Sequence, residues 1–199
     1  MKRFALAITL IISIFLIPLV LSQDDTTVTP ITKGPQIVNF GDGIKISFDF
    51  NADGNYNLET GTYSKPEDAL GLYEFHIKQG ETDVMSVTAM VYRRTHTPLP
   101  IDAPGSEHNS AGYAETQEKT IDNWPGTLTY TWSEDTKDRT PDNAKLVAFE
   151  FYPDGKKVSE GIDGKVSIVG RIQAWNRPNG IDGYRPIFEE ILNTIHVSM

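Results

Sequence analysis

The sequence predicts an α+β domain, in which an antiparallel sheet of about seven strands carries a helix packed on it near the C-terminus. Most of the chain after residue 36 consists of short stretches of alternating apolar and polar residues between turns rich in glycine, proline, asparagine and aspartate. This alternation is typical of antiparallel strands. The segment 164–197 joins a strand pattern to a helical one. An immunoglobulin-like sandwich is the alternative, but a docked C-terminal helix fits it poorly.

The N-terminal segment 1–22 predicts a secretory signal peptide. Two basic residues precede the apolar run 4–21, which is followed by the small residue Ser22. This order is that of a cleavable leader, so we expect cleavage between Ser22 and Gln23 and a protein that is secreted or extracytoplasmic. The alternative is a membrane anchor formed by residues 4–21, although this length is at the lower limit for a bilayer span and Pro18 interrupts the helix.

The segment 23–35 is rich in threonine and aspartate, with two prolines and few apolar residues. Such a composition is typical of a disordered spacer. We therefore expect a single folded domain over 36–199.

The composition limits the class of partner. Removal of Lys2 and Arg3 with the leader takes the 18 basic side chains to 16 against 27 acidic ones, a net charge of −11. This charge disfavours binding to nucleic acid and to anionic lipid headgroups, so membrane contact is expected only through an uncleaved N-terminal segment. The chain has no cysteine, which excludes a thiol nucleophile, a thiolate metal site and disulfides.

The alternating stretches define the strands in order. The most regular is 44–50, and the turn at Asp53-Gly54 predicts that it forms a hairpin with 56–63. The stretch 84–92 is apolar or β-branched on both faces, which is typical of a central strand. The predicted strands are 44–50, 56–63, 73–77, 84–92, 127–132, 145–152 and 166–175.

The segments between the strands are less regular. Ser64–Gly71 has the spacing of a capping box and predicts one helical turn. Three prolines prevent regular structure in 95–109, and 110–119 is a weakly amphipathic candidate helix. Two turns are expected at 153–156 and 161–164, with a further short strand around Val158.

The last element is an amphipathic helix that begins at Pro186. Apolar residues recur at helical spacing and share one face: Phe188, Ile191, Leu192 and Ile195. Because an isolated helix of about ten residues is marginal in water, this apolar face is expected to dock on the sheet.

The opening strand Ile44–Phe50 and the closing pattern Phe188-x-x-Ile191-x-x-Thr194-Ile195-x-Val197, together with the leader, resemble the PsbP-like family, named after an extrinsic subunit of photosystem II. The resemblance covers residues 40–197 and rests on hydrophobic positions. It implies an antiparallel sheet with helices on its faces and an extracytoplasmic location. The resemblance transfers no metal- or partner-binding residue of the family to this chain.

Residues capable of catalysis or metal binding are present but do not form a recognisable motif. The four histidines, at positions 76, 96, 108 and 196, lack the spacing of a zinc pair, and His76 is expected on a solvated strand face. The Asp-Gly sequences, including Asp53-Gly54 and Asp154-Gly155, are interpreted as turns rather than calcium loops. No Gly-x-Ser-x-Gly motif occurs. We therefore predict no catalytic residue, no metal site and no cofactor.

Two tryptophans are the candidate partner-binding residues. Trp124 precedes a predicted strand in a Trp-Pro-Gly turn, and Trp175 ends the outer face of another. Tryptophan is frequent among the anchors of protein interfaces, although it also closes the edge of many cores. We expect a non-enzymatic exported domain that binds another extracytoplasmic protein or a surface component. The alternative is an extracytoplasmic enzyme with a site in the 95–123 region.

Overall fold

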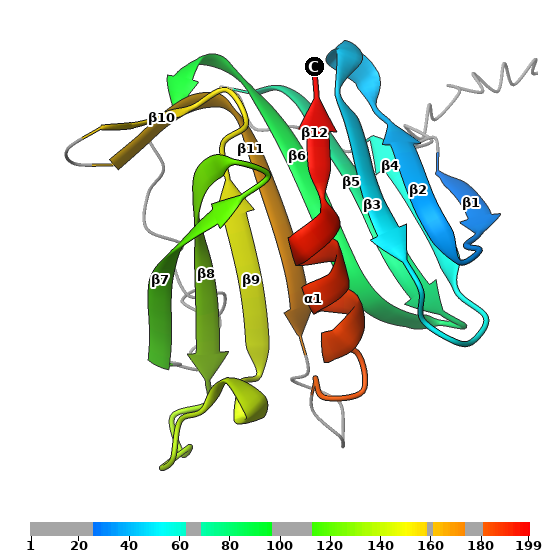
Figure 1. Ribbon diagram of the computed structural model, residues 1–199, viewed down its shortest axis with the longest axis vertical. Helices are drawn as coiled ribbons and strands as arrows, with labels where there is room; N and C mark the ends of the chain where they lie inside the picture. Colours follow the sequence, from blue (N-terminus) through cyan, green and yellow to red (C-terminus); the bar gives the residue numbers. More distant parts are fainter. Residues whose placement is uncertain (1–25, 63–68, 97–112, 159–160, 174–180) are drawn as a thin grey trace, which may run out of the picture.

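The computed structural model describes residues 26–62, 69–96, 113–158, 161–173 and 181–199. These residues form twelve strands and one α-helix. The strands make a nine-stranded and a three-stranded sheet, both antiparallel. The small sheet and the helix lie together on one face of the large sheet (Figure 1). We call this face of the large sheet the inner face and the opposite one the outer face.

The large sheet consists mainly of long strands joined by antiparallel ladders. Its order is β1 (Thr27–Pro30), β4 (Asn57–Thr62), β5 (Ala69–Gln79), β6 (Thr82–His96), β11 (Gly161–Gln173), β9 (Leu146–Phe151), β8 (Trp124–Trp132) and β7 (Tyr113–Ile121), and β10 (Lys156–Val158) pairs with β11. The prediction of a central strand at 84–92 is confirmed, because β6 lies between β5 and β11.

The small sheet supplies the second layer of the core. Its order is β12 (His196–Ser198), β3 (Lys45–Phe50) and β2 (Gly34–Asn39). Alternate side chains of β3 are buried, as its sequence pattern predicts. Phe48 stacks on Phe75 of β5 with ring centroids 5.1 Å apart, which joins the two sheets through the core. Two 3-10 helices, η1 (Gly41–Gly43) and η2 (Pro141–Asn143), lie in loops.

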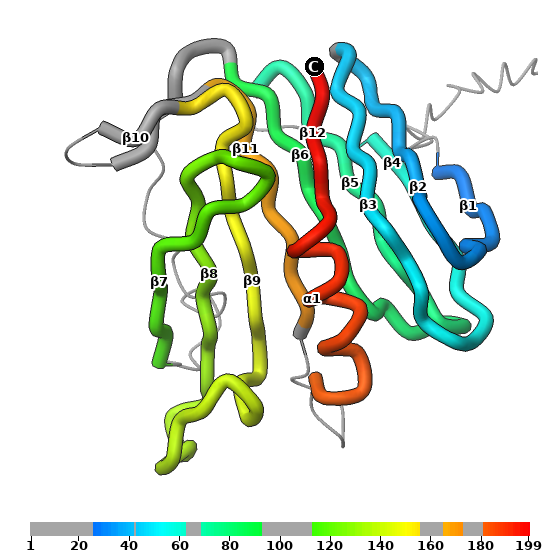
Figure 2. The backbone as a smooth tube through the Cα atoms, in the orientation of Figure 1, coloured from blue at the N-terminus to red at the C-terminus, as the bar shows by residue number. Residues whose placement is uncertain are grey.

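The helix α1 (Arg185–Thr194) begins with Pro186 in its first turn and docks through its apolar face, as predicted. Ile187, Phe188, Ile191 and Leu192 are buried. Two polar residues attach the helix to β3 and its end: Thr194 Oγ1 accepts a hydrogen bond of 3.0 Å from the Asp49 amide, and Glu190 accepts one of 2.9 Å from the Asn51 amide. The chain then continues directly into β12, beside β3 (Figure 2).

The predicted antiparallel sheet and C-terminal helix are confirmed, but the architecture is mostly β rather than a balanced α+β. The described residues hold twelve strands, not seven, against one helix of 10 residues. Part of the difference is the predicted helix 110–119, whose described residues belong to a strand, since 113–121 forms β7. Asp122 and Asn123, with φ of 49° and 65°, form the two-residue turn that pairs β7 with β8.

The predicted hairpin between 44–50 and 56–63 is wrong, although both strands exist. β3 pairs with β2 and β12, whereas β4 pairs with β1 and β5. Residues 51–55 therefore connect the two layers. The reason is that the apolar face of β3 packs against the large sheet, which places β3 opposite β5 instead of beside β4.

The predicted spacer 23–35 is also corrected, because regular structure begins at Thr27 instead of residue 36. Thr27–Pro30 forms β1 along β4, and β2 begins at Gly34. Ile31, which is 9% exposed, is anchored by a hydrogen bond of 2.9 Å from its amide to the Tyr56 carbonyl. This burial and the ladder with β4 offset the cost of ordering the segment.

The remaining local predictions have mixed outcomes. The short strand around Val158 is confirmed as β10, whereas 161–164 is not a turn but the start of β11. The helical turn expected at 64–71 falls largely outside the described residues, and its last three residues belong to β5. The segment 1–22 also lies outside them. Within the described part, no helix is long and apolar enough to be a membrane span.

Candidate functional site

The β7–β8 hairpin ends the large sheet and leaves most of β7 uncovered. Residues 113–118 are all exposed, so neither face of this part of the strand is packed against another layer. β7 pairs with β8 along nine residues, and no other described strand pairs with its far edge. A long edge strand with both faces exposed has its backbone groups available for pairing with another chain.

The short turn determines which backbone groups face this free edge. Ile121 and Trp124 flank the two-residue turn, which makes them a hydrogen-bonded pair, and such pairs alternate with non-hydrogen-bonded ones along the ladder. Thr116 and Thr129 fall at a non-hydrogen-bonded position, and their hydroxyl oxygens lie 2.9 Å apart, as expected where side chains approach closely. The backbone N–H and C=O groups directed away from β8 are those of Ala114, Thr116, Glu118 and Thr120.

Aromatic rings line the inner face at the open end of the hairpin. The guanidinium of Arg139 lies 3.4 Å from the ring centroid of Tyr113, a cation–π contact on an exposed tyrosine. Tyr130 stacks on Trp132, with centroids 6.1 Å apart. The buried Trp132 donates a hydrogen bond of 2.8 Å from Nε1 to the Thr140 carbonyl, which fixes the loop after β8.

A cavity of about 180 Å³ lies between the inner face of the sheet and α1, beside β7. Its floor is apolar and consists of Leu128, Val147, Ile172, Ile181, Phe188 and Leu192. Its polar lining comes from three different elements: Lys119 on β7, Tyr130 on β8, and Arg185, Glu189 and Asn193 on α1. Burial raises the pKa of Tyr130, so its phenol stays neutral near pH 7.

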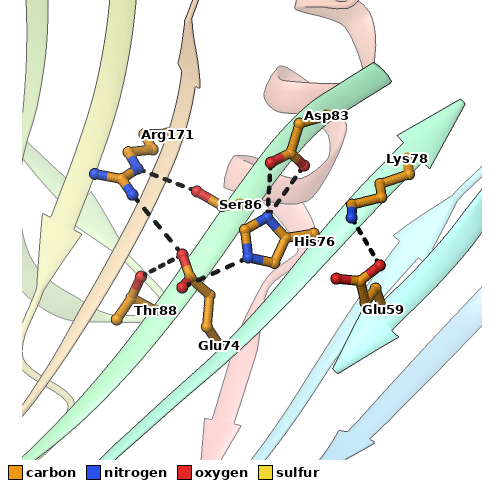
Figure 3. Close-up of polar contacts among 8 residues, drawn as sticks. All are labelled: Glu59, Glu74, His76, Lys78, Asp83, Ser86, Thr88 and Arg171. Atoms are coloured by element: carbon orange, nitrogen blue, oxygen red, sulfur yellow. Dashed lines mark hydrogen bonds and ion pairs between the residues drawn. The ribbon is translucent and has the colours of Figure 1, made fainter. Parts of the chain in front are cut away.

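The outer face carries a separate network of charged side chains on β4, β5, β6 and β11 (Figure 3). His76 lies between two carboxylates, with Nδ1 2.9 Å from Asp83 Oδ2 and Nε2 3.5 Å from Glu74 Oε2. The hydrogen bonds to Asp83 and Glu74 raise the pKa of His76 to about 9, against the effect of burial. His76 is therefore protonated at neutral pH and cannot serve as a general base there.

Glu74 is the centre of this network. Thr88 Oγ1 donates a hydrogen bond of 3.2 Å to the Glu74 carboxylate, and Arg171 Nη2 lies 3.8 Å from it. Arg171 is also held by Ser86, because its Nε donates a hydrogen bond of 3.1 Å to Ser86 Oγ. Burial disfavours the charged form of Glu74, but the hydrogen bond and charge of His76, followed by Arg171 and Thr88, outweigh it and lower the pKa.

The network is balanced in charge. A further pair, Lys78 Nζ and Glu59 Oε2 at 2.7 Å, extends it along the sheet. Three carboxylates thus accompany three cationic side chains (Figure 3). Because every charged group has a partner, the arrangement is that of a structural network that satisfies a half-buried polar face. The expectation that His76 lies on a solvated face is corrected, since its side chain is only 16% exposed.

A second polar cluster lies on the same face at β9 and β11. Tyr152, which is 1% exposed, donates a hydrogen bond of 2.5 Å to Glu150 Oε1, and Ser167 Oγ donates to the same oxygen at 3.1 Å. Burial, and then the charge of Glu150, raise the pKa of the Tyr152 phenol. The phenol therefore stays protonated and acts as a donor.

The structure shows where the predicted binding residues and turns lie. Trp124 is half-buried, packs against the core and belongs to β8, so the turn is at Asp122–Asn123 and not at Trp-Pro-Gly. Trp175 lies outside the described residues, as do 97–112, including His108. Asp154 lies in a turn closed by a hydrogen bond of 2.9 Å from the Gly155 amide to the Tyr152 carbonyl, and its side chain accepts hydrogen bonds from the amides of Lys165 and Val166 at 2.9 and 3.1 Å. In the described ranges, no three His, Cys, Asp or Glu side chains are grouped to hold a metal.

No sequence pattern indicated the residues around the cavity. Lys119 lies in the segment that its sequence predicts as a helix, and Glu189 is not among the predicted site residues. One signal was present: Asp122-Asn123 between two β-branched stretches is a turn sequence typical of a hairpin. That assignment would have placed Lys119 on a strand.

Comparison of the chain with protein-family models, curated proteins and solved structures finds no match.

Proposed function

We propose that this chain is a non-enzymatic extracytoplasmic domain that binds an extended segment of a partner protein along the free edge of β7. The observation that carries the proposal is the exposure of residues 113–118 on an edge strand nine residues long. Strand addition of this kind uses main-chain hydrogen bonds for affinity and alternate side chains for specificity. The apolar leader pattern at 4–21 supports the extracytoplasmic location.

The other edges of the two sheets suit a partner strand less well. At the opposite end of the large sheet, β1 has 4 residues, and in the small sheet β12 has 3. β2 has 6 residues, two of them at positions 34 and 35 a glycine and a proline, which weaken strand pairing. β7 is longer and contains neither residue type.

The charge of the region favours one class of partner. Glu115 and Glu118 are exposed on β7, and the nearby loop adds three exposed acidic side chains against two exposed basic ones: Glu134, Asp135 and Asp138 against Lys137 and Arg139. The whole chain carries a net charge of −9. Two copies of the chain carry the same negative net charge, which disfavours self-pairing. A partner segment with lysine or arginine beside its apolar residues is complementary.

Two earlier expectations extend this proposal. The resemblance to the PsbP-like family implies the same extracytoplasmic location, and the contact role of Trp124 and Trp175 stays a prediction. For the alternative of an enzyme site in 95–123, the described part is 95–96 and 113–123; His96, the last residue of β6, is its one histidine, and it contains no serine. The structure thus offers no specific support for that alternative within these residues.

The proposal can be tested with a proline at the free edge. Thr116→Pro removes an N–H that points away from β8, so the β7–β8 ladder is kept while strand addition is blocked. Thr116→Val is the matched control, because it removes the same hydroxyl but keeps the N–H. The probe is a displayed library of random peptides selected on the wild-type domain.

We expect selected peptides to combine basic with apolar residues. They should bind Thr116→Val as they bind the wild type, and bind Thr116→Pro at least about tenfold more weakly, a loss of about 1.4 kcal/mol. Circular dichroism and urea unfolding check that both variants are folded. Selection of no peptide, or equal binding to Thr116→Pro, overturns strand addition.

The predicted cleavage of the leader has its own test. Mass measurement of native material should find Gln23 as the first residue, whereas an intact Met1 would establish the membrane anchor.

A further inference from the structure

The cavity beside α1 has the size and lining of a small-molecule site. Its volume of about 180 Å³ is slightly larger than the roughly 150 Å³ of an engineered apolar cavity that binds benzene. Leu128 and Val147 on the sheet and Phe188 and Leu192 on the helix provide an apolar floor. The cavity therefore has room for one six-membered ring or one branched aliphatic group.

Two opposite charges line the same cavity without neutralising each other. Lys119 comes from β7 and Glu189 from α1, so they belong to different walls. Neither makes a hydrogen bond or an ion pair with the other or with any residue in the part of the chain that the structure describes. In contrast, the third charged residue of the lining, Arg185, is held by Asp142 at 3.3 Å and by the Pro141 carbonyl.

We propose that this cavity binds a small zwitterion with an apolar group, such as a free α-amino acid with an aromatic or branched aliphatic side chain. The apolar group fills the floor between Leu128 and Phe188. The ligand carboxylate binds the Lys119 ammonium, and the ligand ammonium binds the Glu189 carboxylate. Both protein side chains are long and flexible, which lets them close on charges that are adjacent in the ligand.

The pair of charges selects against simpler ligands. A neutral apolar molecule would fill the floor but leave both charges without a partner. An apolar anion would satisfy Lys119 but meet Glu189 and a chain of net charge −9. An apolar cation would pair with Glu189 but leave Lys119 without a partner. The zwitterion satisfies both walls at once, so it should bind more tightly than either singly charged analogue.

The inference can be tested by calorimetric titration with three ligands that share one ring: phenylalanine, 3-phenylpropionate and phenethylamine. Lys119→Gln should weaken phenylalanine and 3-phenylpropionate by about threefold to tenfold and leave phenethylamine unchanged. Glu189→Gln should weaken phenylalanine and phenethylamine by the same factor and leave 3-phenylpropionate unchanged. This range corresponds to a partly exposed charge pair worth about 0.6–1.4 kcal/mol.

Two controls locate the binding and separate it from the β7 edge. Methyl resonances of Leu128 and Leu192 should shift on addition of phenylalanine to the wild-type domain, and shifts confined to other regions would overturn the site. Thr116→Pro should bind phenylalanine like the wild type, because its change is at the free edge. Absence of phenylalanine binding, or binding that neither charge variant weakens, overturns the inference whatever the peptide selection shows.

Discussion

The ring of Phe188 on α1 lies 5.7 Å, between centroids, from the ring of Phe149 on β9, at an interplanar angle of 50°. Phe149 in turn covers Gly170 on β11, where an added Cβ would lie 2.2 Å from Phe149 Cζ. Helix, ring and glycine thus form one stack through the core. This stack sets how closely α1 approaches the sheet, and with it the shape of the adjacent cavity.

Replacement of Phe188 with alanine should destabilise the domain by about 3–5 kcal/mol, because it empties a buried aromatic position under the helix. Urea unfolding measures the free energy. Glu189→Ala is the control: the residue is exposed and should change stability by about 0.5 kcal/mol or less. A loss of less than about 1 kcal/mol for Phe188→Ala would show that the helix does not depend on this contact.

Gly170→Ala should be destabilising for the opposite reason. Its methyl group would overlap the Phe149 ring, which is fully buried, and overpacking of this kind costs about 1–3 kcal/mol. Gly183→Ala is the matched control, since an added Cβ there meets nothing within 4 Å.

A double variant separates the clash from a backbone effect. Phe149→Leu should itself destabilise the domain, but Gly170→Ala should cost less in that background because the ring atoms are gone. If the cost of Gly170→Ala is the same in both backgrounds, the ring contact is not its cause. Unfolding in urea supplies all four free energies.

Local patterns predicted the elements in which the apolar residues recur with a clear period. The alternation of Tyr73, Phe75 and Ile77 predicted the strand at 73–77, which lies within β5. The helical spacing around Phe188 determined α1 and its buried face. In these segments the period of the apolar residues follows directly from the face that packs against the core.

The pairings that join distant segments could not be predicted in this way. Alternation in β3 shows that one face is buried but not which layer buries it, so the wrong hairpin followed. β7 has polar residues on both faces and therefore carries no apolar period at all. The candidate sites could not be predicted for the same reason, because each consists of residues that are distant in sequence. Arg171 lies beside Glu74, and Lys119 lines a cavity with Glu189, only in the folded domain.

His76 should make stability depend on pH in the alkaline range. Its pKa is about 9 in the folded domain against 6.5 as the ordinary value. A raised pKa means that the stabilisation is complete below about pH 6.5 and is lost as pH rises through about 9. Since the group is partly exposed, we expect the loss to be about 1–2 kcal/mol rather than the full value of the shift.

The measurement is urea unfolding between pH 6 and 10 together with the NMR titration of the His76 ring. His76→Gln keeps a polar side chain but cannot titrate, so this part of the pH dependence should disappear. Titration of the ring near its ordinary pKa, or an equal alkaline loss in the variant, would contradict the arrangement between Asp83 and Glu74.

Asp122 should hold the C-terminal strand in place. Its carboxylate is 7% exposed, lies 2.7 Å from His196 Nδ1 and accepts a hydrogen bond of 2.8 Å from the Val197 amide. It thereby connects the β7–β8 turn to β12 across the two layers. Asp122→Ala leaves the Val197 donor without this acceptor and places alanine at a φ of 49°, so we expect a loss of about 2–3 kcal/mol.

Two further substitutions divide this effect into its parts. Asn tolerates positive φ and keeps one acceptor oxygen, so Asp122→Asn should lose least, about 1 kcal/mol. Glycine relieves the backbone strain but provides no acceptor, so Asp122→Gly should fall between Asn and Ala. Urea unfolding gives the order, and hydrogen exchange of the Val197 amide should accelerate in the Ala and Gly variants but less in Asn. Unchanged protection of that amide in Asp122→Ala would mean that β12 is held by its ladder with β3 alone.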